Sequence, residues 1–272
     1  MSELFTVFGS DGFVGKRLVA RLSDLGHHVQ TVGRNEDFQS KYPTLGHVIY
    51  CAGVTGSRFK TEQFRVVNAH ISLMAQVLES GTYTTFLYMS SARMYEESLD
   101  GTSVGARFSV DPWQVSDFYN LSKLMGESLI LQSGISSARI VRVAYAVDYA
   151  DDSTDNVTHF IRSALKGRVR FTAHRESVKD YVVMKDIVDV LPTLALNGSS
   201  RMYNLASGMN TSTNELAEML IEETGCDVEF VNEEELRSPR PIDISLLESE
   251  FSYRPQSVVD YARRVIKSEN LA

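Results

Sequence analysis

The sequence predicts an α/β protein built around a doubly wound parallel sheet. Short apolar, β-rich runs alternate with longer amphipathic stretches through the first half of the chain. This alternation is expected where each strand is followed by a helix that crosses over to the next strand. Glycines spaced three apart separate the first apolar run from the first amphipathic stretch. After about residue 146 the alternation becomes less regular, which predicts a small C-terminal α/β lobe.

The first βαβ unit occupies residues 4–32. Residues 4–8 are apolar and predict a buried strand. The apolar positions from Phe13 onward have helical spacing, and Gly26 ends this helix. Residues 27–32 then predict a second strand. The stretch "GSDGFVG" therefore forms the turn between a strand and a helix.

Each glycine of this turn has a physical role in binding a dinucleotide. Gly9 permits a tight turn, Gly12 lets a pyrophosphate approach the backbone, and Gly15 lets the helix pack closely on the strand. The helix N-terminus presents free N–H groups to a phosphate. A flexible turn without a ligand is the alternative, but the strand–turn–helix context favours a Rossmann-type cofactor site. The expected cofactor-binding residues of the turn are Gly9, Asp11, Gly12, Phe13, Val14 and Gly15.

The end of the second strand bears on which dinucleotide binds. NAD-binding units usually have an acidic residue there, which binds the ribose 2′-hydroxyl. Here Gly33 stands at that position and Arg34 follows it. A guanidinium can pair with a 2′-phosphate, so we expect NADP(H). In the alternative, Glu36 or Asp37 binds the ribose and the cofactor is NAD(H).

The remaining expected elements follow the same pattern. Residues 33–46 leave room only for a short helix or none before the third strand. The expected strands are 46–53, 84–91, 138–145, 201–208 and 227–231. The expected helices are 61–80, 116–134, 156–167, 212–225 and 257–268. Ser212 and Glu215 have the spacing of a capping box at the start of one of these helices.

Composition restricts the kinds of partner. The chain of 272 residues is 43% hydrophobic and 23% charged, with a net charge of −8. A negative protein is not expected to bind nucleic acid or an anionic membrane as its main partner. The two cysteines show no metal-binding spacing, so no metal site is expected. No apolar run reaches the ~20 residues of a membrane span, and the N-terminal residues lack the pattern of a signal peptide. We therefore expect a cytoplasmic protein.

Three side chains are candidates for acid–base chemistry. Tyr119 and Lys123 are four residues apart and share one face of a predicted helix. A neighbouring ammonium would lower the pKa of the Tyr119 phenol and allow proton exchange with an alcohol or carbonyl. Ser91 ends the predicted fourth strand, at the edge of the sheet where ligands bind. There it would hydrogen-bond the substrate oxygen.

Together these residues resemble the extended short-chain dehydrogenase/reductase family, which includes nucleotide-sugar epimerases, dehydratases and reductases. The resemblance covers nearly the whole chain, and no single motif carries it. Its motifs are "GSDGFVG", "YCAG", "VNAHIS", "MSSARMY", "YNLSK", "VKDYVVMKDIVDV", "YNLASG" and "RPIDIS". It implies a catalytic set of Ser91, Tyr119 and Lys123, and places Ala52 and Gly53 beside the cofactor together with Lys123. Ser91 would also contact the substrate, and Arg240 would contact a nucleotide diphosphate.

The resemblance also implies an organisation. Residues 1–147 would form the NADP-binding domain and 148–272 mostly the substrate lobe, with about 178–208 returning to the Rossmann sheet. Relatives are often dimers, so a homodimer is an expected assembly. The chain departs from the family at two places. Tyr145 stands in the substrate region where an asparagine is common, and Ala92 and Arg93 replace the Asp-Glu of the sugar dehydratases. Dehydration is therefore not expected.

The predicted activity is NADPH-dependent reduction of a keto group on a nucleotide-activated deoxysugar. Arg34 favours this reductase because net reduction usually draws on NADPH. An NAD(P)-dependent nucleotide-sugar epimerase, a reductase of another carbonyl compound and a non-catalytic dinucleotide sensor or scaffold are the alternatives. The presence of Ser91, Tyr119 and Lys123 together favours an enzyme.

Overall fold

The computed structural model describes residues 2–34, 36–54, 56–231 and 234–271. The chain forms two compact units, each made of several segments. The first unit comprises residues 1–97, 107–142 and 187–203. The second comprises residues 98–106, 143–186 and 204–272.

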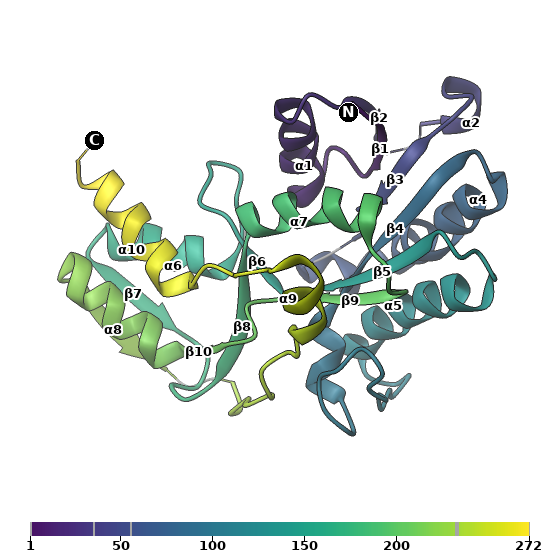
Figure 1. Cartoon of the computed structure of the whole chain (residues 1–272). Helices are drawn as coiled ribbons and strands as arrows, with labels where there is room; N and C mark the ends of the chain where they lie inside the picture. Colours follow the sequence, from purple (N-terminus) through teal and green to yellow (C-terminus); the bar gives the residue numbers. More distant parts are fainter. Residues whose placement is uncertain (1, 35, 55, 232–233, 272) are drawn as a thin grey trace. The chain divides into compact units, whose positions relative to one another are not determined.

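The central feature of the fold is a six-stranded sheet (Figure 1). Its order is β2-β1-β3-β4-β5-β9, and it is parallel, as the sequence predicts. Its strands are β1 (Leu4–Phe8), β2 (His28–Val32), β3 (Gly46–Tyr50), β4 (Tyr83–Ser91), β5 (Ala138–Val143) and β9 (Met202–Leu205). The strand β1 pairs with both β2 and β3, so the direction of winding reverses between β1 and β3. Ligands of such sheets bind beyond the carboxyl ends of the strands at this reversal.

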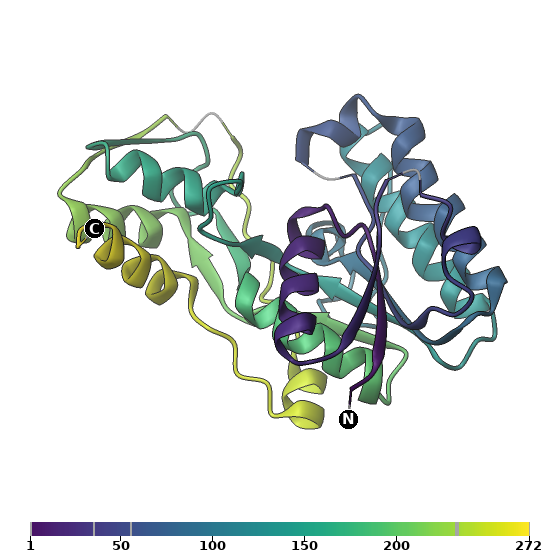
Figure 2. The ribbon, with the colours of Figure 1, turned by 90° about the horizontal axis from the view of Figure 1, so that it is seen from above.

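Helices connect these strands. They are α1 (Phe13–Asp24), α2 (Phe38–Lys41), α3 (Gln63–Val67), α4 (Leu73–Ser80), α5 (Val115–Gln132) and α7 (Met184–Asn197). Figure 2 shows α1 and α7 on one side of the sheet and α4 and α5 on the other. An ion pair of 2.6 Å between Arg21 Nε and Asp189 Oδ1 joins α1 to α7. The helix in the connection after β2, α2, has only four residues, which confirms the short helix expected there.

The long helix expected over 61–80 forms, with one irregularity. Between α3 and α4 the residues Asn68–Ser72 form a π-helical segment, η2. Two short 3-10 segments, η1 (Gly56–Lys60) and η3 (Ala92–Glu97), precede α3 and follow β4. π-Helical turns are frequent at functional sites, and η2 places His70 in the interior with none of its surface exposed.

Large aromatic side chains fill the core of the first unit. Tyr50 stands between Phe8 and Phe86 at ring-centroid distances of 5.6 and 5.8 Å, and all three residues are fully buried. They lie on three adjacent strands, so their packing fixes the strands relative to one another. The rigid carboxyl edge of β1, β3 and β4 depends on this layer.

Over its described residues, the second unit contains two small sheets and four helices. The sheets have the orders β10-β8-β6 and β11-β7. The strands are β6 (Tyr145–Val147), β7 (Arg168–Phe171), β8 (Val178–Val183), β10 (Asn210–Ser212) and β11 (Asp227–Phe230). The helices are α6 (Asn156–Ala164), α8 (Thr213–Thr224), α9 (Ser245–Phe251) and α10 (Val258–Glu269). The predicted capping box of Ser212 and Glu215 is present in full.

The strand predicted over 138–145 is shorter than expected. It ends at Val143, and Tyr145 begins a separate strand that pairs in parallel with β8. Sequence periodicity does not reveal this break, because the apolar pattern continues while the pairing partner changes. The buried Asp180 on β8 accepts hydrogen bonds from the backbone N–H groups of Ser207 and Gly208. Burial raises the pKa of the Asp180 carboxyl, and these hydrogen bonds oppose the shift.

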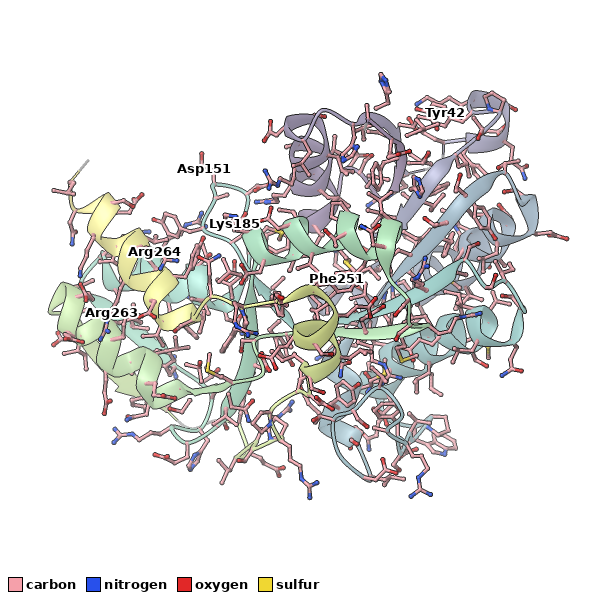
Figure 3. All side chains as sticks on the ribbon, in the orientation of Figure 1. Tyr42, Asp151, Lys185, Phe251, Arg263 and Arg264 are labelled. Carbon is pink, nitrogen blue, oxygen red and sulfur yellow. The ribbon has the colours of Figure 1, made fainter. Side chains whose placement is uncertain are left out.

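Arg263 and Arg264, labelled in Figure 3, are neighbours on α10 and have different partners. Arg263 forms an ion pair with Glu222 of α8 at 2.5 Å, whereas Arg264 donates to Gln256 Oε1 at 2.7 Å. The core beneath these helices includes Phe171, whose ring stacks on Phe230 at 5.2 Å. Across the described ranges, no helix is long and apolar enough to cross a membrane.

Candidate active site

The glycine turn has the close packing that the sequence predicts. Gly9 has a φ of +78°, and a Cβ added to it would lie 2.7 Å from the backbone of Ala52, just after β3. A Cβ on Gly15 would lie 2.1 Å from the carbonyl oxygen of Gly9. No side chain fits at either position without moving the backbone. The turn therefore draws the start of α1 and the end of β3 close together at the reversal point of the sheet.

The start of α1 is suited to receive a phosphate group. Gly12 is the N-cap residue, and no side chain caps this helix end. Phe13, Val14 and Gly15 follow as the first residues of a helix of 12 residues. Amide N–H groups in the first turn of a helix lack acceptors within the helix and favour an anion. These residues fit the pyrophosphate of a dinucleotide.

Two carboxylates lie near Gly33 at the end of β2. A Cβ added to Gly33 would meet Asp11 Oδ2 at 2.6 Å. The Gly33 N–H donates to Glu36 Oε2 at 3.0 Å, and this hydrogen bond lowers the pKa of the Glu36 carboxyl. Arg34 is exposed in the same turn. Asp11 therefore lies next to Gly33, the position after β2 where NAD-binding proteins usually have an acidic residue. The sequence does not reveal this proximity.

The two loop acids considered as ribose ligands take part in local structure. Glu36 forms an ion pair with Lys41 at 3.3 Å. The Asp37 side chain caps α2 by accepting from the Ser40 N–H at 3.2 Å and from the Ser40 hydroxyl at 2.6 Å. Figure 3 labels Tyr42 at the end of α2, where its hydroxyl donates to the Thr31 carbonyl of β2 at 3.1 Å. These contacts hold both acids within the β2–α2 turn.

Ser91 and Tyr119 come together at the carboxyl end of β4. Ser91 is the last residue of this strand and Tyr119 lies in the second turn of α5. The Ser91 hydroxyl acts on the Tyr119 phenol and lowers its pKa, against the effect of burial. The Ser91 hydroxyl also accepts from the Arg93 N–H at 3.2 Å. The tertiary structure thus pairs the two hydroxyl groups that the sequence separates.

Lys123 lies beside this pair and is almost entirely buried. Its ammonium Nζ donates to the Met89 carbonyl at 3.0 Å and lies 6.0 Å from the centroid of the Tyr119 ring. Burial lowers the pKa of Lys123 to about 8. A Cβ added to Gly53 would lie 3.8 Å from the Lys123 Nζ, so the predicted Ala52–Gly53 segment and Lys123 adjoin.

The structure does not show the expected lowering of the Tyr119 pKa by Lys123. Burial raises the pKa of the Tyr119 phenol, while the Ser91 hydrogen bond and the charge of Arg93 oppose that shift. The Arg93 Cζ is 5.9 Å from the centroid of the Tyr119 ring. The Lys123 ammonium lies at nearly the same distance, 6.0 Å, but it also donates to the Met89 carbonyl.

His70 is a site residue that the sequence reasoning did not single out. Its Nε2 accepts from the Val54 N–H at 3.1 Å, and its Nδ1 lies 2.8 Å from the Ser122 hydroxyl. Ser122 in turn donates to the Tyr119 carbonyl at 2.7 Å. Burial lowers the pKa of His70 to about 2, so the ring is neutral. The motif "VNAHIS" drew attention to Asn68, which is exposed, but no sequence signal distinguished the buried histidine.

Two expected substrate contacts lie in the second unit. Tyr145 is 37% exposed, and the Lys179 Nζ lies 5.1 Å from its ring centroid. Arg240 is exposed in the segment before α9. Both cysteines are free thiols, and burial raises the pKa of the Cys51 thiol to about 12. In the part of the chain that the structure describes, no three His, Cys, Asp or Glu side chains gather as metal ligands.

The fold and these residues define a class of protein. A glycine turn at the reversal of a parallel sheet and a Tyr–Lys pair beside a serine are features of short-chain dehydrogenases and reductases. Residues 5–206 match the NAD dependent epimerase/dehydratase family, and the chain belongs to that family. It is an NAD(P)-dependent enzyme of the extended short-chain dehydrogenase/reductase type.

Solved structures share this fold across the whole chain. RMD from Pseudomonas aeruginosa complexed with NADPH is 20% identical, with a TM-score of 0.79 over 98% of this chain and 97% of that chain. UDP-glucuronic acid 4-epimerase from Bacillus cereus, in complex with UDP-glucuronic acid and NAD, is 18% identical, with a TM-score of 0.77 over 97% and 99%. TunA, an NAD-dependent NDP-hexosamine 5,6-dehydratase, is 16% identical, with a TM-score of 0.79 over 100% and 99%. No protein with a curated description matches the sequence.

Proposed function

We propose that this enzyme reduces a keto group on a nucleotide-activated deoxysugar with NADPH. The observation that carries the proposal is that Ser91, at the end of β4, and Tyr119, on α5, come together beside Lys123. A hydroxyl pair at this edge of the sheet is suited to bind a carbonyl oxygen and protonate it. The nucleotide-sugar substrate is supported by family membership and by the fold shared with a UDP-glucuronic acid epimerase.

Each residue has a defined part in the proton transfer. The Ser91 hydroxyl accepts the Arg93 N–H and would donate its own proton to the substrate carbonyl, which orients it. Tyr119 donates a proton to the oxygen as the carbonyl carbon is reduced, which yields the alcohol and a phenolate. Lys123 and the glycine turn would hold a reduced nicotinamide dinucleotide, which would supply the hydride for that carbon. Lys123 binds the nicotinamide ribose and supports the phenolate electrostatically.

The preference for NADPH rests on the β2–α2 turn. Arg34 follows Gly33 and is exposed, so its guanidinium is available to a 2′-phosphate. Glu36 is paired with Lys41 and Asp37 caps α2, which removes the two loop acids from the ribose. The proposal therefore assigns the 2′-phosphate to Arg34.

A second candidate function, NAD-dependent epimerisation of a nucleotide sugar, is supported by Asp11. Its carboxylate lies against Gly33, where NAD-binding proteins usually carry an acid, and it would repel a 2′-phosphate. An epimerase returns the hydride to the same sugar and usually retains NAD. Arg34 and Asp11 thus favour opposite cofactors, and their relative strength decides between the two functions.

The organisation of the enzyme is part of the proposal. The first 147 residues would bind the dinucleotide, while residues 148–272 would mostly bind the substrate. Of the stretch 178–208, which was expected to return to the six-stranded sheet, only the later part with β9 does so, because β8 pairs with β6 and β10. Tyr145 would contact the sugar and Arg240 the nucleotide diphosphate. We also propose a cytoplasmic homodimer.

Titration with NADPH and NADH, followed by nicotinamide fluorescence, tests the cofactor assignment. The reductase requires tighter binding of NADPH, with Arg34→Ala reducing this preference and Asp11→Asn increasing it. Tighter binding of NADH, lost in Asp11→Asn, would instead support the epimerase. Assays with nucleotide keto-deoxysugars then follow NADPH consumption. Isomer interconversion without net cofactor turnover would contradict the reductase, and binding of neither dinucleotide would contradict both functions.

A further inference from the structure

We propose that Arg93 is an electrostatic positioning residue for Tyr119, which stabilises its phenolate jointly with Lys123. This inference rests on the proposed use of Tyr119 as the proton donor. A tyrosine that donates its proton must carry a negative charge until it is reprotonated. In this site that charge would form between two cations on different elements, one on η3 and one on α5.

The geometry holds the Arg93 guanidinium over the tyrosine. Its Cζ lies 5.9 Å from the centroid of the Tyr119 ring and 5.4 Å from that of Phe59. The two rings are themselves 5.4 Å apart. A guanidinium within about 6 Å of an aromatic centroid is attracted by the electrons of the ring. Two rings therefore orient one cation, which keeps Arg93 at the reacting phenol instead of in solvent.

Arg93 is also anchored through its backbone. Its N–H donates to the Ser91 hydroxyl at 3.2 Å, and that hydroxyl lowers the pKa of the Tyr119 phenol. One residue thus contacts both hydroxyl-bearing groups of the site, the serine by its main chain and the tyrosine ring by its side chain.

The second cation does not make Arg93 redundant. The Lys123 Nζ lies 6.0 Å from the Tyr119 centroid, but it donates to the Met89 carbonyl and burial lowers its pKa to about 8. At slightly alkaline pH a large part of Lys123 is neutral. A guanidinium keeps its charge throughout this range. Arg93 is therefore the cation that persists as the pH rises.

The other titratable groups around the site do not cancel this charge. The His70 ring on η2 lies 5.6 Å from the Tyr119 ring and is neutral above about pH 2. Burial raises the pKa of the Tyr88 phenol on β4 well above its usual value and that of the Cys51 thiol to about 12, so both stay neutral. Glu127, which acts on Lys123, is paired with Arg142. Among the described side chains, no carboxylate forms an ion pair with Arg93.

The test measures the ionisation of Tyr119 directly and needs no substrate. Replacing Tyr119 with 3,5-difluorotyrosine brings the phenol into an accessible pH range and provides a fluorine NMR signal. Its pKa is measured in the cofactor-free protein with Arg93, with Arg93→Met and with Arg93→Lys. Loss of a charge at this distance is expected to raise the pKa by about one unit, and lysine is expected to restore most of the difference.

Two further readouts separate this inference from a structural effect and from the proposed function. Thermal unfolding and dinucleotide binding should be nearly unchanged in Arg93→Met, while the alkaline limb of its kcat profile shifts in the same direction as the phenol pKa. An unchanged phenol pKa in a folded Arg93→Met protein would overturn the inference. A raised pKa in an enzyme that reduces no nucleotide keto-sugar would support the role of Arg93 and contradict the proposed substrate instead.

Discussion

His70 Nδ1 lies 2.8 Å from the Ser122 hydroxyl, and this contact links the π-helical segment η2 to the helix that carries Tyr119. The Val54 N–H donates to Nε2, so the ring proton is on Nδ1 and is donated to Ser122. The Ser122 hydroxyl in turn donates to the Tyr119 carbonyl oxygen. A neutral, fully buried histidine therefore helps to fix the backbone that carries the Tyr119 phenol.

This histidine makes stability depend on pH. Burial lowers its pKa to about 2, whereas an unfolded histidine titrates near 6.5. Between these values the unfolded chain binds the additional proton, so the free energy of unfolding falls as pH falls below about 6.5. The slope from one such group is about 1.4 kcal/mol per pH unit. The free energy of unfolding, measured with urea from pH 5 to 8, should change less steeply with pH in His70→Gln than in the wild-type protein. The substitution His28→Gln, at an exposed histidine, is the control. Equal slopes in all three proteins would contradict the assignment.

Removal of the Tyr119 hydroxyl should separate catalysis from binding. Tyr119→Phe retains the ring that packs against Phe59 at 5.4 Å but cannot transfer a proton. We expect kcat to fall by about 10²- to 10⁴-fold while dinucleotide affinity changes little. Steady-state rates and fluorescence titration measure the two effects. Tyr83→Phe, at the opposite end of β4, is the control, and a Tyr119→Phe enzyme with normal turnover would refute the proton-donor role.

The buried ion pair beneath the site should be sensitive to loss of one partner. Arg142 donates to both oxygens of Glu127 at 2.9 and 2.7 Å and to the Tyr95 hydroxyl at 2.8 Å. Arg142→Met leaves the Glu127 charge without its partner in the interior, so we expect a loss of about 3–5 kcal/mol in unfolding free energy. The ion pair of Arg168 with Glu229 is exposed, so Arg168→Met should lower the unfolding free energy by less than about 1 kcal/mol. Chemical denaturation compares the two variants, and similar losses would be inconsistent with the buried pair.

A methyl group on Gly15 should disrupt the dinucleotide turn. Its Cβ would lie 2.1 Å from the Gly9 carbonyl oxygen, so the turn or α1 must move. Gly15→Ala is expected to lower NADPH affinity by at least tenfold and to reduce the melting temperature. Gly105→Ala is a matched control, because an added Cβ meets nothing within 4 Å there. Normal affinity in Gly15→Ala would show that this turn does not bind the cofactor.

The proposed homodimer can be tested on the surface of the first unit. On α5, Met125 is 55% exposed, and on α3 Phe64 is 92% exposed. If these helices pair between copies, Met125→Glu should shift sedimentation from dimer to monomer at micromolar concentration while the protein stays folded. Leu236→Glu, exposed in the second unit, is the control for an added charge. An unchanged dimer would place its interface elsewhere, and a wild-type monomer would refute the dimer.

The sequence by itself determined the architecture that places the site. The period of the apolar residues distinguishes strands from helices, and the glycine spacing marks the turn where α1 meets β3. Those features depend on residues close together in the chain, so local patterns reveal them. The capping box at Ser212 and the short α2 have the same origin. The separate strand at Tyr145 was not predicted from the sequence, because its pairing partner, β8, is distant along the chain.

Only the tertiary structure decided which side chains act on one another. Asp11 lies against Gly33, Arg93 lies over Tyr119, and His70 reaches Ser122. None of these pairs follows from spacing, because each joins elements that the folding of the sheet brings together. Burial at these contacts also sets the charges, since it lowers the pKa of Lys123 and keeps His70 neutral. Sequence patterns identify the groups that carry chemistry, whereas packing and desolvation determine the charge states in which those groups meet.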